Sequence, residues 1–194
     1  MKYAPSVLVG MCVMVAPAPA LAGVVINAVE LGGDVVVTGG GTLDLSLWTY
    51  LSTVGQQAGV RASMSIEIGS TQHLDDLYYH PVGFSGPNAI GPGHDIVFAD
   101  HGGGNGLGLF WLHSDPAIST PAGYTSGDPL GPSTATFSGH TFASLGLTKG
   151  SYTWVWDTAD GNGDFFTINV TPSPGTYAIF GVGCCLWRRR RLLA

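Results

Sequence analysis

A short stretch near the end of the chain has residue types and spacing that suit a hard cation. Oxygen-bearing side chains alternate with glycines there, and carboxylate and amide oxygens in a glycine-rich turn can wrap Ca²⁺. An EF-hand loop would also need glycine and glutamate where Phe165 and Thr171 stand. Asp, Asn and Gly are also ordinary turn residues, so we expect either a Ca²⁺ site or a plain hairpin turn. The candidate metal ligands are Asp157, Asp160, Asn162 and Asp164.

Other constellations that could carry chemistry are weak. The histidines show no His-x-His or His-Glu-x-x-His spacing, and a zinc site built from distant strands cannot be recognised from spacing. Gly-x-Ser-x-Gly is absent, and Glu30 and Glu67 are the only glutamates, so a paired-carboxylate glycosidase would need Asp. We therefore expect no catalytic residues and no cofactor other than Ca²⁺. The six histidines are His73, His80, His94, His101, His113 and His140.

These residues would be positioned by short β-strands. Helical periodicity is scarce, and β-branched and aromatic runs are separated by clusters of Gly, Pro, Asn and Asp. Gly32-Gly33 is a tight hairpin signal between the first two runs. The expected strands are Val24–Glu30, Asp34–Thr38, Thr42–Leu47, Val60–Ile68, Asp95–Ala99, Gly108–His113, Ala135–Phe137, Ser151–Asp157 and Phe165–Val170.

The last two expected strands form the firmest pair. Tyr152, Trp154 and Trp156 alternate with smaller residues, which places the three rings on one face of a strand. Such a row of rings favours the core, and a sugar-stacking surface is the alternative. Gly69 to Pro92 and Ser114 to Ser133 are rich in Gly and Pro, and we expect both to be long surface loops.

This pattern predicts an all-β protein, an antiparallel β-sandwich of jelly-roll-like or similar architecture, over residues 23–171. Only Arg61 and Lys149 of the seven basic residues lie in that part, against all 13 acidic ones, so its formal charge is −11. Such a domain repels nucleic-acid phosphates, which excludes a nucleic-acid-binding function. An acidic extracellular surface suits solubility, cation binding or a neutral polysaccharide partner. The domain contains no cysteine and so no internal disulfide.

Both ends of the chain have the character of targeting segments. Residues 1–22 combine Lys2, an apolar run from Val7 to Val15 and the small residues Ala20 and Ala22, which predicts a signal peptide cut after Ala22. Residues 175–187 form an apolar segment of roughly 20 Å as a helix, a short span for a bilayer core of about 30 Å. The basic cluster after it would stay cytoplasmic by the positive-inside rule, and it comprises Arg188, Arg189, Arg190 and Arg191.

The tail of residues 172–194 resembles a PEP-CTERM sorting signal. Pro172, Ser173 and Pro174, the apolar run with its glycines and the terminal arginines carry the resemblance, with Ser173 at the position of the motif's glutamate. The GlyGly-CTERM type of tail, handled by rhombosortase, is the alternative. Pro121-Ala122-Gly123-Tyr124 and Gly150-Ser151-Tyr152-Thr153-Trp154 are also similar to a recurring ectodomain of PEP-CTERM proteins.

The resemblance implies an exported bacterial protein that is anchored at the inner membrane in transit by a short transmembrane helix. It further implies processing by an exosortase-like enzyme and delivery to the cell surface or the extracellular matrix. We expect a non-catalytic surface or matrix protein, and the alternative is a carbohydrate- or Ca²⁺-binding extracellular module. The expected partners are therefore the exosortase-like processing enzyme and the membrane. An extracellular polysaccharide is a further candidate partner.

Overall fold

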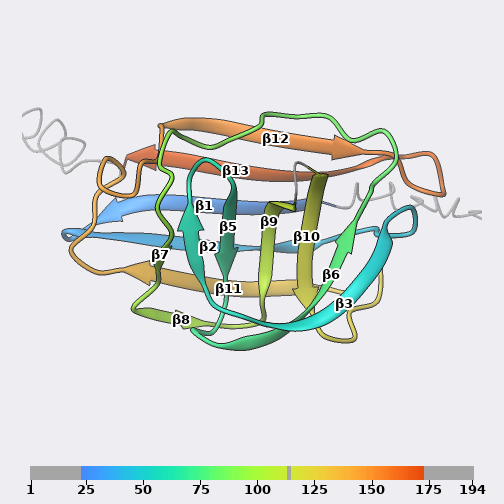
Figure 1. The fold of residues 1–194 in the computed structure, drawn as a ribbon, viewed down its shortest axis with the longest axis horizontal. Helices are drawn as coiled ribbons and strands as arrows, with labels where there is room; N and C mark the ends of the chain where they lie inside the picture. The colour runs from blue at the N-terminus through green and yellow to red at the C-terminus, as the bar shows by residue number, and fades with distance from the viewer. Residues whose placement is uncertain (1–22, 113–114, 173–194) are drawn as a thin grey trace, which may run out of the picture.

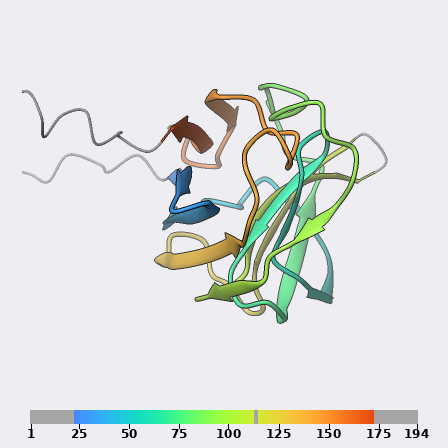
Figure 2. The ribbon, with the colours of Figure 1, turned by 90° about the vertical axis from the view of Figure 1, so that its left-hand side faces the viewer.

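The computed structural model describes residues 23–112 and 115–172, and all regular structure in these ranges is β. The strands form two sheets that lie face to face as two layers, with the strands of one running across those of the other (Figure 1; Figure 2). The expectation of an all-β, sandwich-like domain is thus confirmed. Within the described ranges there is no helix with the length and apolar character needed to cross a membrane.

The first sheet has six strands and contains both ends of the domain. Its core-facing residues are the alternate, wholly buried side chains expected from the sequence, such as Phe166, Ile168 and Val170. Gly32 and Gly33 adopt positive φ angles of 66° and 97°, as the tight hairpin between the first two strands requires. In order across the sheet the strands are β12 (Gly150–Trp156), β13 (Asp164–Pro172), β1 (Gly23–Leu31), β2 (Asp34–Thr42), β11 (Leu130–Phe137) and β8 (His101–Gly103).

One pairing departs from the expected antiparallel sandwich, because β1 and β13 run parallel, with Val24 opposite Phe166. The other ladders are antiparallel. Hairpin loops impose antiparallel pairing on strands adjacent in sequence. The first and last strands of the domain have no such link, so they can pair in either direction.

The second sheet has seven strands and carries the candidate site. In order across the sheet they are β3 (Thr49–Gln56), β6 (His73–Tyr79), β10 (Asp115–Pro121), β9 (Leu107–Leu112), β5 (Ser65–Ile68), β4 (Gly59–Arg61) and β7 (Val97–Phe98). Ile66, Ile68, Leu107, Leu109 and Ile118 are buried against the first sheet. Their neighbours in sequence, including Glu67 and Ser119, point to the opposite face because side chains alternate along a strand.

Aromatic rings fill the space between the layers. Trp154 and Trp156 are 0% and 2% exposed, and Trp156 contacts Trp48 edge-on with 5.3 Å between ring centroids. The Trp154 Nε1–H donates to the carbonyl of Pro87. Tyr152 packs against the same core and its hydroxyl donates to the Thr148 carbonyl. The core interpretation of this aromatic row is therefore confirmed over a sugar-stacking surface.

Several expected boundaries in the second sheet are wrong. Thr42–Leu47 is irregular beyond β2, and β3 begins only at Thr49. Val60–Ile68 is two strands, β4 and β5, because the small residues Ala62 and Ser63 allow a turn in which the Met64 N–H donates to the Arg61 carbonyl. The expected loops at 69–92 and 114–133 contain β6 and β10, whose polar residues hide their strand character.

Candidate functional site

The second sheet curls so that distant strands meet on its open face. Gln56 at the end of β3 lies opposite His73 of β6, and Gly59 at the start of β4 lies opposite Glu67 of β5. Only three Cα–Cα steps join Gln56 to Gly59, a span of at most about 11 Å at 3.8 Å per step. Since β10 and β9 lie between β6 and β5 in the sheet, this short link draws His73 and Glu67 together across them.

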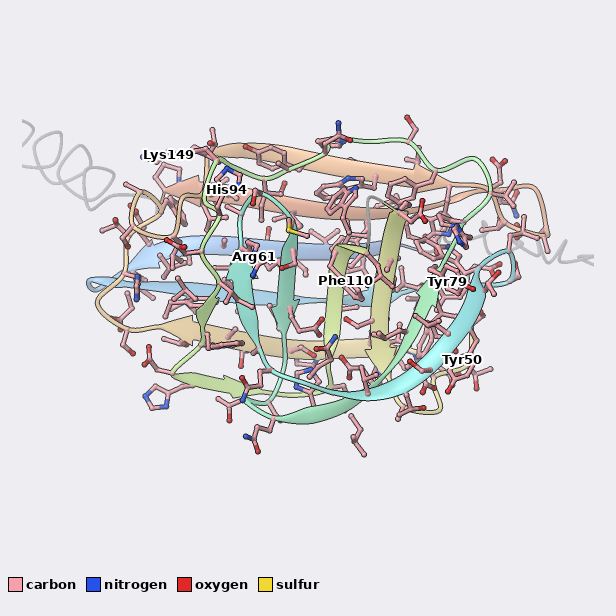
Figure 3. The ribbon with its side chains drawn as sticks, in the orientation of Figure 1. Tyr50, Arg61, Tyr79, His94, Phe110 and Lys149 are labelled. Atoms are coloured by element: carbon pink, nitrogen blue, oxygen red, sulfur yellow. The ribbon has the colours of Figure 1, made fainter. Side chains whose placement is uncertain are left out.

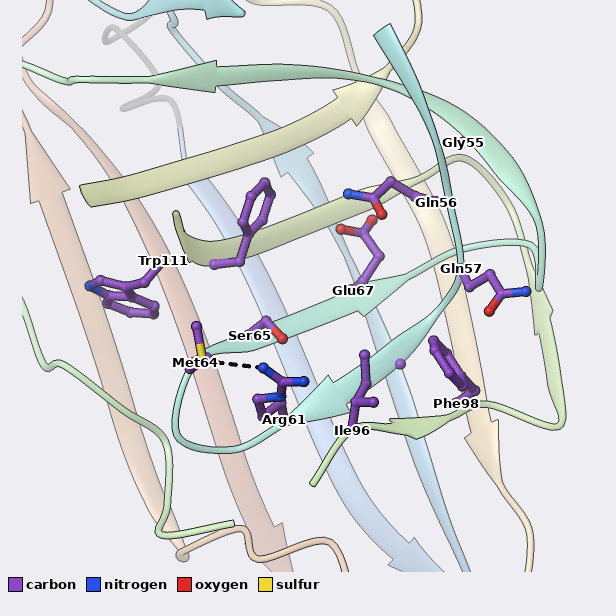
Figure 4. A pocket seen from close by; sticks show the side chains of 12 residues that line it. Gly55, Gln56, Gln57, Arg61, Met64, Ser65, Glu67, Ile96, Phe98 and Trp111 are labelled. Carbon is purple, nitrogen blue, oxygen red and sulfur yellow. Dashed lines mark hydrogen bonds between the residues drawn. The ribbon is translucent and has the colours of Figure 1, made fainter. Parts of the chain in front are cut away.

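A groove of about 450 Å³ opens on this face (Figure 4). The Gln56 and Glu67 side chains lie side by side within it. Phe98 and Ile96 on one wall are 51% and 45% exposed, which is high for large apolar side chains. Around them are the aromatic residues Phe110 and Trp111 and the polar residues Arg61 and Ser65.

Arg61 is one of two basic residues in the domain, and it lies in this groove (Figure 3; Figure 4). No carboxylate in the described part of the chain forms an ion pair with it. Its Nη1 lies 3.3 Å from the Met64 sulfur, and its Nε is buried without a hydrogen-bond partner. The terminal Nη groups, which form no ion pair with the described carboxylates, are therefore the donors that Arg61 offers a ligand in the groove.

Three ionisable side chains converge beside the groove, and one of them, Glu67, lines it. His73 Nε2 lies 3.2 Å from Asp75 Oδ2 and 3.4 Å from Glu67 Oε1. The Asp75 side chain is fully buried, and those of His73 and Glu67 are 9% and 11% exposed. Ser119 Oγ donates a short hydrogen bond to Glu67 Oε2. We call Glu67, His73 and Asp75 the carboxylate–histidine cluster.

Two glycines make room for this cluster. A Cβ added to Gly106 would overlap the Asp75 carboxylate and the His73 ring, and one added to Gly108 would overlap the Glu67 carboxylate. Gly108 lies directly opposite Glu67 in the β5–β9 ladder. The absence of side chains at these two positions is what lets carboxylates from β5 and β6 approach each other over β9.

The cluster is electrostatically unusual. Burial raises the pKa of Glu67 from its ordinary 4.5 to about 7, with the nearby negative charge of Asp75 adding to the rise. The close approach of the Asp75 carboxylate, and then of the Glu67 carboxylate, raises the pKa of His73 from 6.5 to about 10. Perturbed groups in a groove are typical of functional sites.

A second pocket, of about 540 Å³, lies on the other side of the β3–β4 link. Its lining includes His73, and it shares Gly55, Gln56 and Gln57 with the groove, whose lining includes Glu67. The carboxylate–histidine cluster therefore lies between the two openings.

The candidate Ca²⁺ ligands lie in the β12–β13 turn, away from this cluster. Asp157, Asn162 and Asp164 line one pocket of about 300 Å³. Asp160 is occupied locally, since its Oδ1 accepts from the Thr158 hydroxyl and the Asn162 N–H at 2.5 and 3.0 Å. Both oxygens of Asp164 accept backbone N–H groups, from Asp44 and Phe165 at 2.6 Å each. The structure thus uses two of the four side chains to tie the turn, and the Ca²⁺ site stays a prediction.

Among the described residues, the group of three metal-binding side chains with ligand atoms within 4.8 Å of one another is the carboxylate–histidine cluster. Sequence reasoning missed it because β6 was expected to be loop. Two features of the sequence could have indicated it. Asp75 and Asp76 closely follow His73, and Glu67 lies between the apolar residues Ile66 and Ile68. Only the pairing of the strands joins these features into one site.

The residues predicted to direct targeting lie largely outside the described ranges. Pro172 is the last residue of β13, opposite Glu30, whereas Ser173, Pro174 and Arg188 to Arg191 follow it beyond the described part, as Ala20 and Ala22 precede it. Comparison with protein-family models, with curated proteins and with solved structures finds no match. Function is therefore inferred from the groove, the cluster and the targeting pattern.

Proposed function

We propose that this chain is an exported, non-catalytic surface or matrix protein whose β-domain binds polysaccharide in the groove of the second sheet. The observation that carries the binding role is the groove itself, where the exposed ring of Phe98 and the half-buried ring of Trp111 stand beside planar polar side chains. Sugar rings stack their apolar faces on aromatic rings, and their hydroxyls need donors and acceptors at the edges. Phe98 and Trp111 supply the first, and Gln56 and Arg61 supply the second.

The charge of the domain favours a neutral polysaccharide. A formal charge of −11 over residues 23–171 repels anionic polymers at long range. The single arginine of the groove adds donors without making the surface basic. Export is supported by the signal-peptide pattern at residues 1–22 and by the PEP-CTERM-like tail, which together would deliver the domain to the side of the membrane where such polymers occur.

The binding role is tested with the full chain and soluble neutral polysaccharides built of glucose, mannose or galactose, by affinity electrophoresis and calorimetry. We expect Phe98→Ala to weaken binding of the recognised polymer about 10-fold, close to 1.4 kcal/mol, because stacking area is lost. Tyr50→Ala is the matched control, since Tyr50 is 52% exposed and lies outside the groove (Figure 3). Equal loss in both variants, or no binding by the parent chain, would contradict the proposal.

Three further measurements test its other parts. The intact mass of the protein recovered from its native cell gives both processing sites, and a chain retaining residues 1–22 and 173–194 in the cytosol would refute export. Replacing Arg188 to Arg191 with serine should leave the tail uncleaved or release the protein. Hydrolysis of chromogenic glycosides that depends on Glu67 would refute the non-catalytic assignment.

A further inference from the structure

The histidine of the carboxylate–histidine cluster is held in one orientation by the backbone. His73 Nδ1 lies 2.6 Å from the Ser70 carbonyl oxygen. A carbonyl only accepts hydrogen bonds, so Nδ1 carries a proton and Nε2 is left as the coordinating nitrogen of the neutral ring. A second interaction that fixes the tautomer in this way is the usual arrangement around a metal-binding histidine.

The atoms around Nε2 have little else to bind. Asp75 is fully buried, and neither of its carboxylate oxygens accepts a hydrogen bond. Glu67 Oε1 and His73 Nε2 are likewise buried without a hydrogen-bond partner. Only Glu67 Oε2 is satisfied, by Ser119. Even when the His73 ring is protonated, two buried carboxylates share a single positive charge, whereas a divalent cation among them would balance both.

The spacing agrees with a small transition-metal ion. With Zn–N and Zn–O bonds of about 2.0–2.1 Å, the edge of a coordination tetrahedron is about 3.3–3.4 Å. The Nε2 distances to Asp75 Oδ2 and Glu67 Oε1, 3.2 and 3.4 Å, are close to that edge. An imidazole ligand favours Zn²⁺ and its first-row neighbours, whereas Ca²⁺ prefers a shell of six to eight oxygens.

We propose that Glu67, His73 and Asp75 form a binding site for a divalent first-row transition metal ion of the Zn²⁺ class. The ligands come from β5 and β6, and Gly106 and Gly108 of the β9 region leave the space over which they meet. Glu67 lines the groove and His73 lines the second pocket, so an ion held by the cluster would lie next to both openings. This site is independent of polysaccharide recognition, which depends on the outer walls of the groove.

Metal binding is tested without any sugar. The full chain is stripped with a chelator, exchanged into metal-free buffer and titrated with Zn²⁺ in a calorimeter. One ion should bind per chain, and His73→Gln and Asp75→Asn should each weaken binding by at least about 10-fold. His80→Gln is the matched control, because His80 also lies near a carboxylate, 3.8 Å from Asp115, but both side chains are more than half exposed. It should bind Zn²⁺ as the parent does.

Co²⁺ provides a measurement on the parent chain alone. A four- or five-coordinate site gives strong visible d–d absorption that Zn²⁺ abolishes and an equal concentration of Ca²⁺ leaves unchanged. A parent chain that binds no stoichiometric Zn²⁺, a Co²⁺ spectrum like that of the hydrated ion, or a His73→Gln variant that binds like the parent would each overturn the proposal. The cluster would then be a buried ion pair in which a proton takes the place of the metal.

Discussion

The substitution Gly106→Ala tests whether the cluster is packed as tightly as the structure indicates. The added Cβ would overlap Asp75 Oδ1, Asp75 Oδ2 and the His73 ring. These atoms have little room to move, since Asp75 is fully buried and His73 is tied to the Ser70 carbonyl. The φ angle of Gly106 lies outside the left-handed region, so the backbone itself accepts alanine.

Inserting one methyl group into a well-packed site costs about 1–3 kcal/mol. Gly→Ala substitution at a compatible backbone position contributes about 0.4–1 kcal/mol of stability in the other direction, by restricting the unfolded chain. The net expectation is a loss of roughly 0–2.6 kcal/mol, and its central value of about 1.3 kcal/mol lowers the melting temperature of a domain of this size by about 3–5 °C.

The assay is urea unfolding followed by tryptophan fluorescence, with a chelator present so that metal binding does not contribute. Gly55→Ala is the control, because Gly55 lines the same groove but nothing lies within 4 Å of its added Cβ. That variant should be as stable as the parent or slightly more so. Equal stabilities of the two variants, with equal m-values, would show that β9 does not approach the carboxylates as described.

Three further predictions concern the rest of the fold. Burial raises the pKa of Asp164 from 3.8 to about 6. Its contribution to stability is therefore greatest below pH 4 and is lost as pH rises through about 6. Denaturant titrations of Asp164→Asn should show a free energy of unfolding that depends less on pH over that range. Tyr124→Phe removes the hydroxyl that accepts from the Leu43 N–H at 2.8 Å and should cost about 1–3 kcal/mol by urea unfolding, whereas an unchanged midpoint would mean that water replaces it. Leu109→Ala, at a position 1% exposed, should cost about 2–5 kcal/mol by thermal unfolding; Leu74→Ala, at a position 64% exposed, is the control and should cost far less.

The first sheet was largely predictable from sequence. Strands β1, β12 and β13 lie where alternation placed them, and Trp154, Trp156 and Phe166 are buried as their period of two implied. A sheet face packed on a core needs apolar residues at every second position, and this alternation can be recognised in the sequence. The parallel pairing of β1 with β13 is not local, and nothing in the sequence indicated it.

The second sheet was predicted poorly for a physical reason. Its open face carries buried ionisable residues beside apolar ones, so strand β6 lacks the simple alternation of an apolar face with a solvated one. Asp75 lies on the open face of its sheet and is buried because the sheet curls over that face. A buried aspartate cannot be distinguished from an exposed one in the sequence. The segment was therefore expected to be loop, although it carries two of the three cluster residues.

What the sequence by itself determined is the class of the domain, its aromatic core and its strong negative charge, and the targeting role of the two ends stays a prediction. These depend on composition and on the spacing of neighbours along the chain. Only the tertiary structure brought Glu67, His73 and Asp75 together and opened a groove beside them. The cluster forms because only three Cα–Cα steps connect Gln56 to Gly59, which curls the sheet. It also needs Gly106 and Gly108, whose lack of side chains leaves room for the carboxylates.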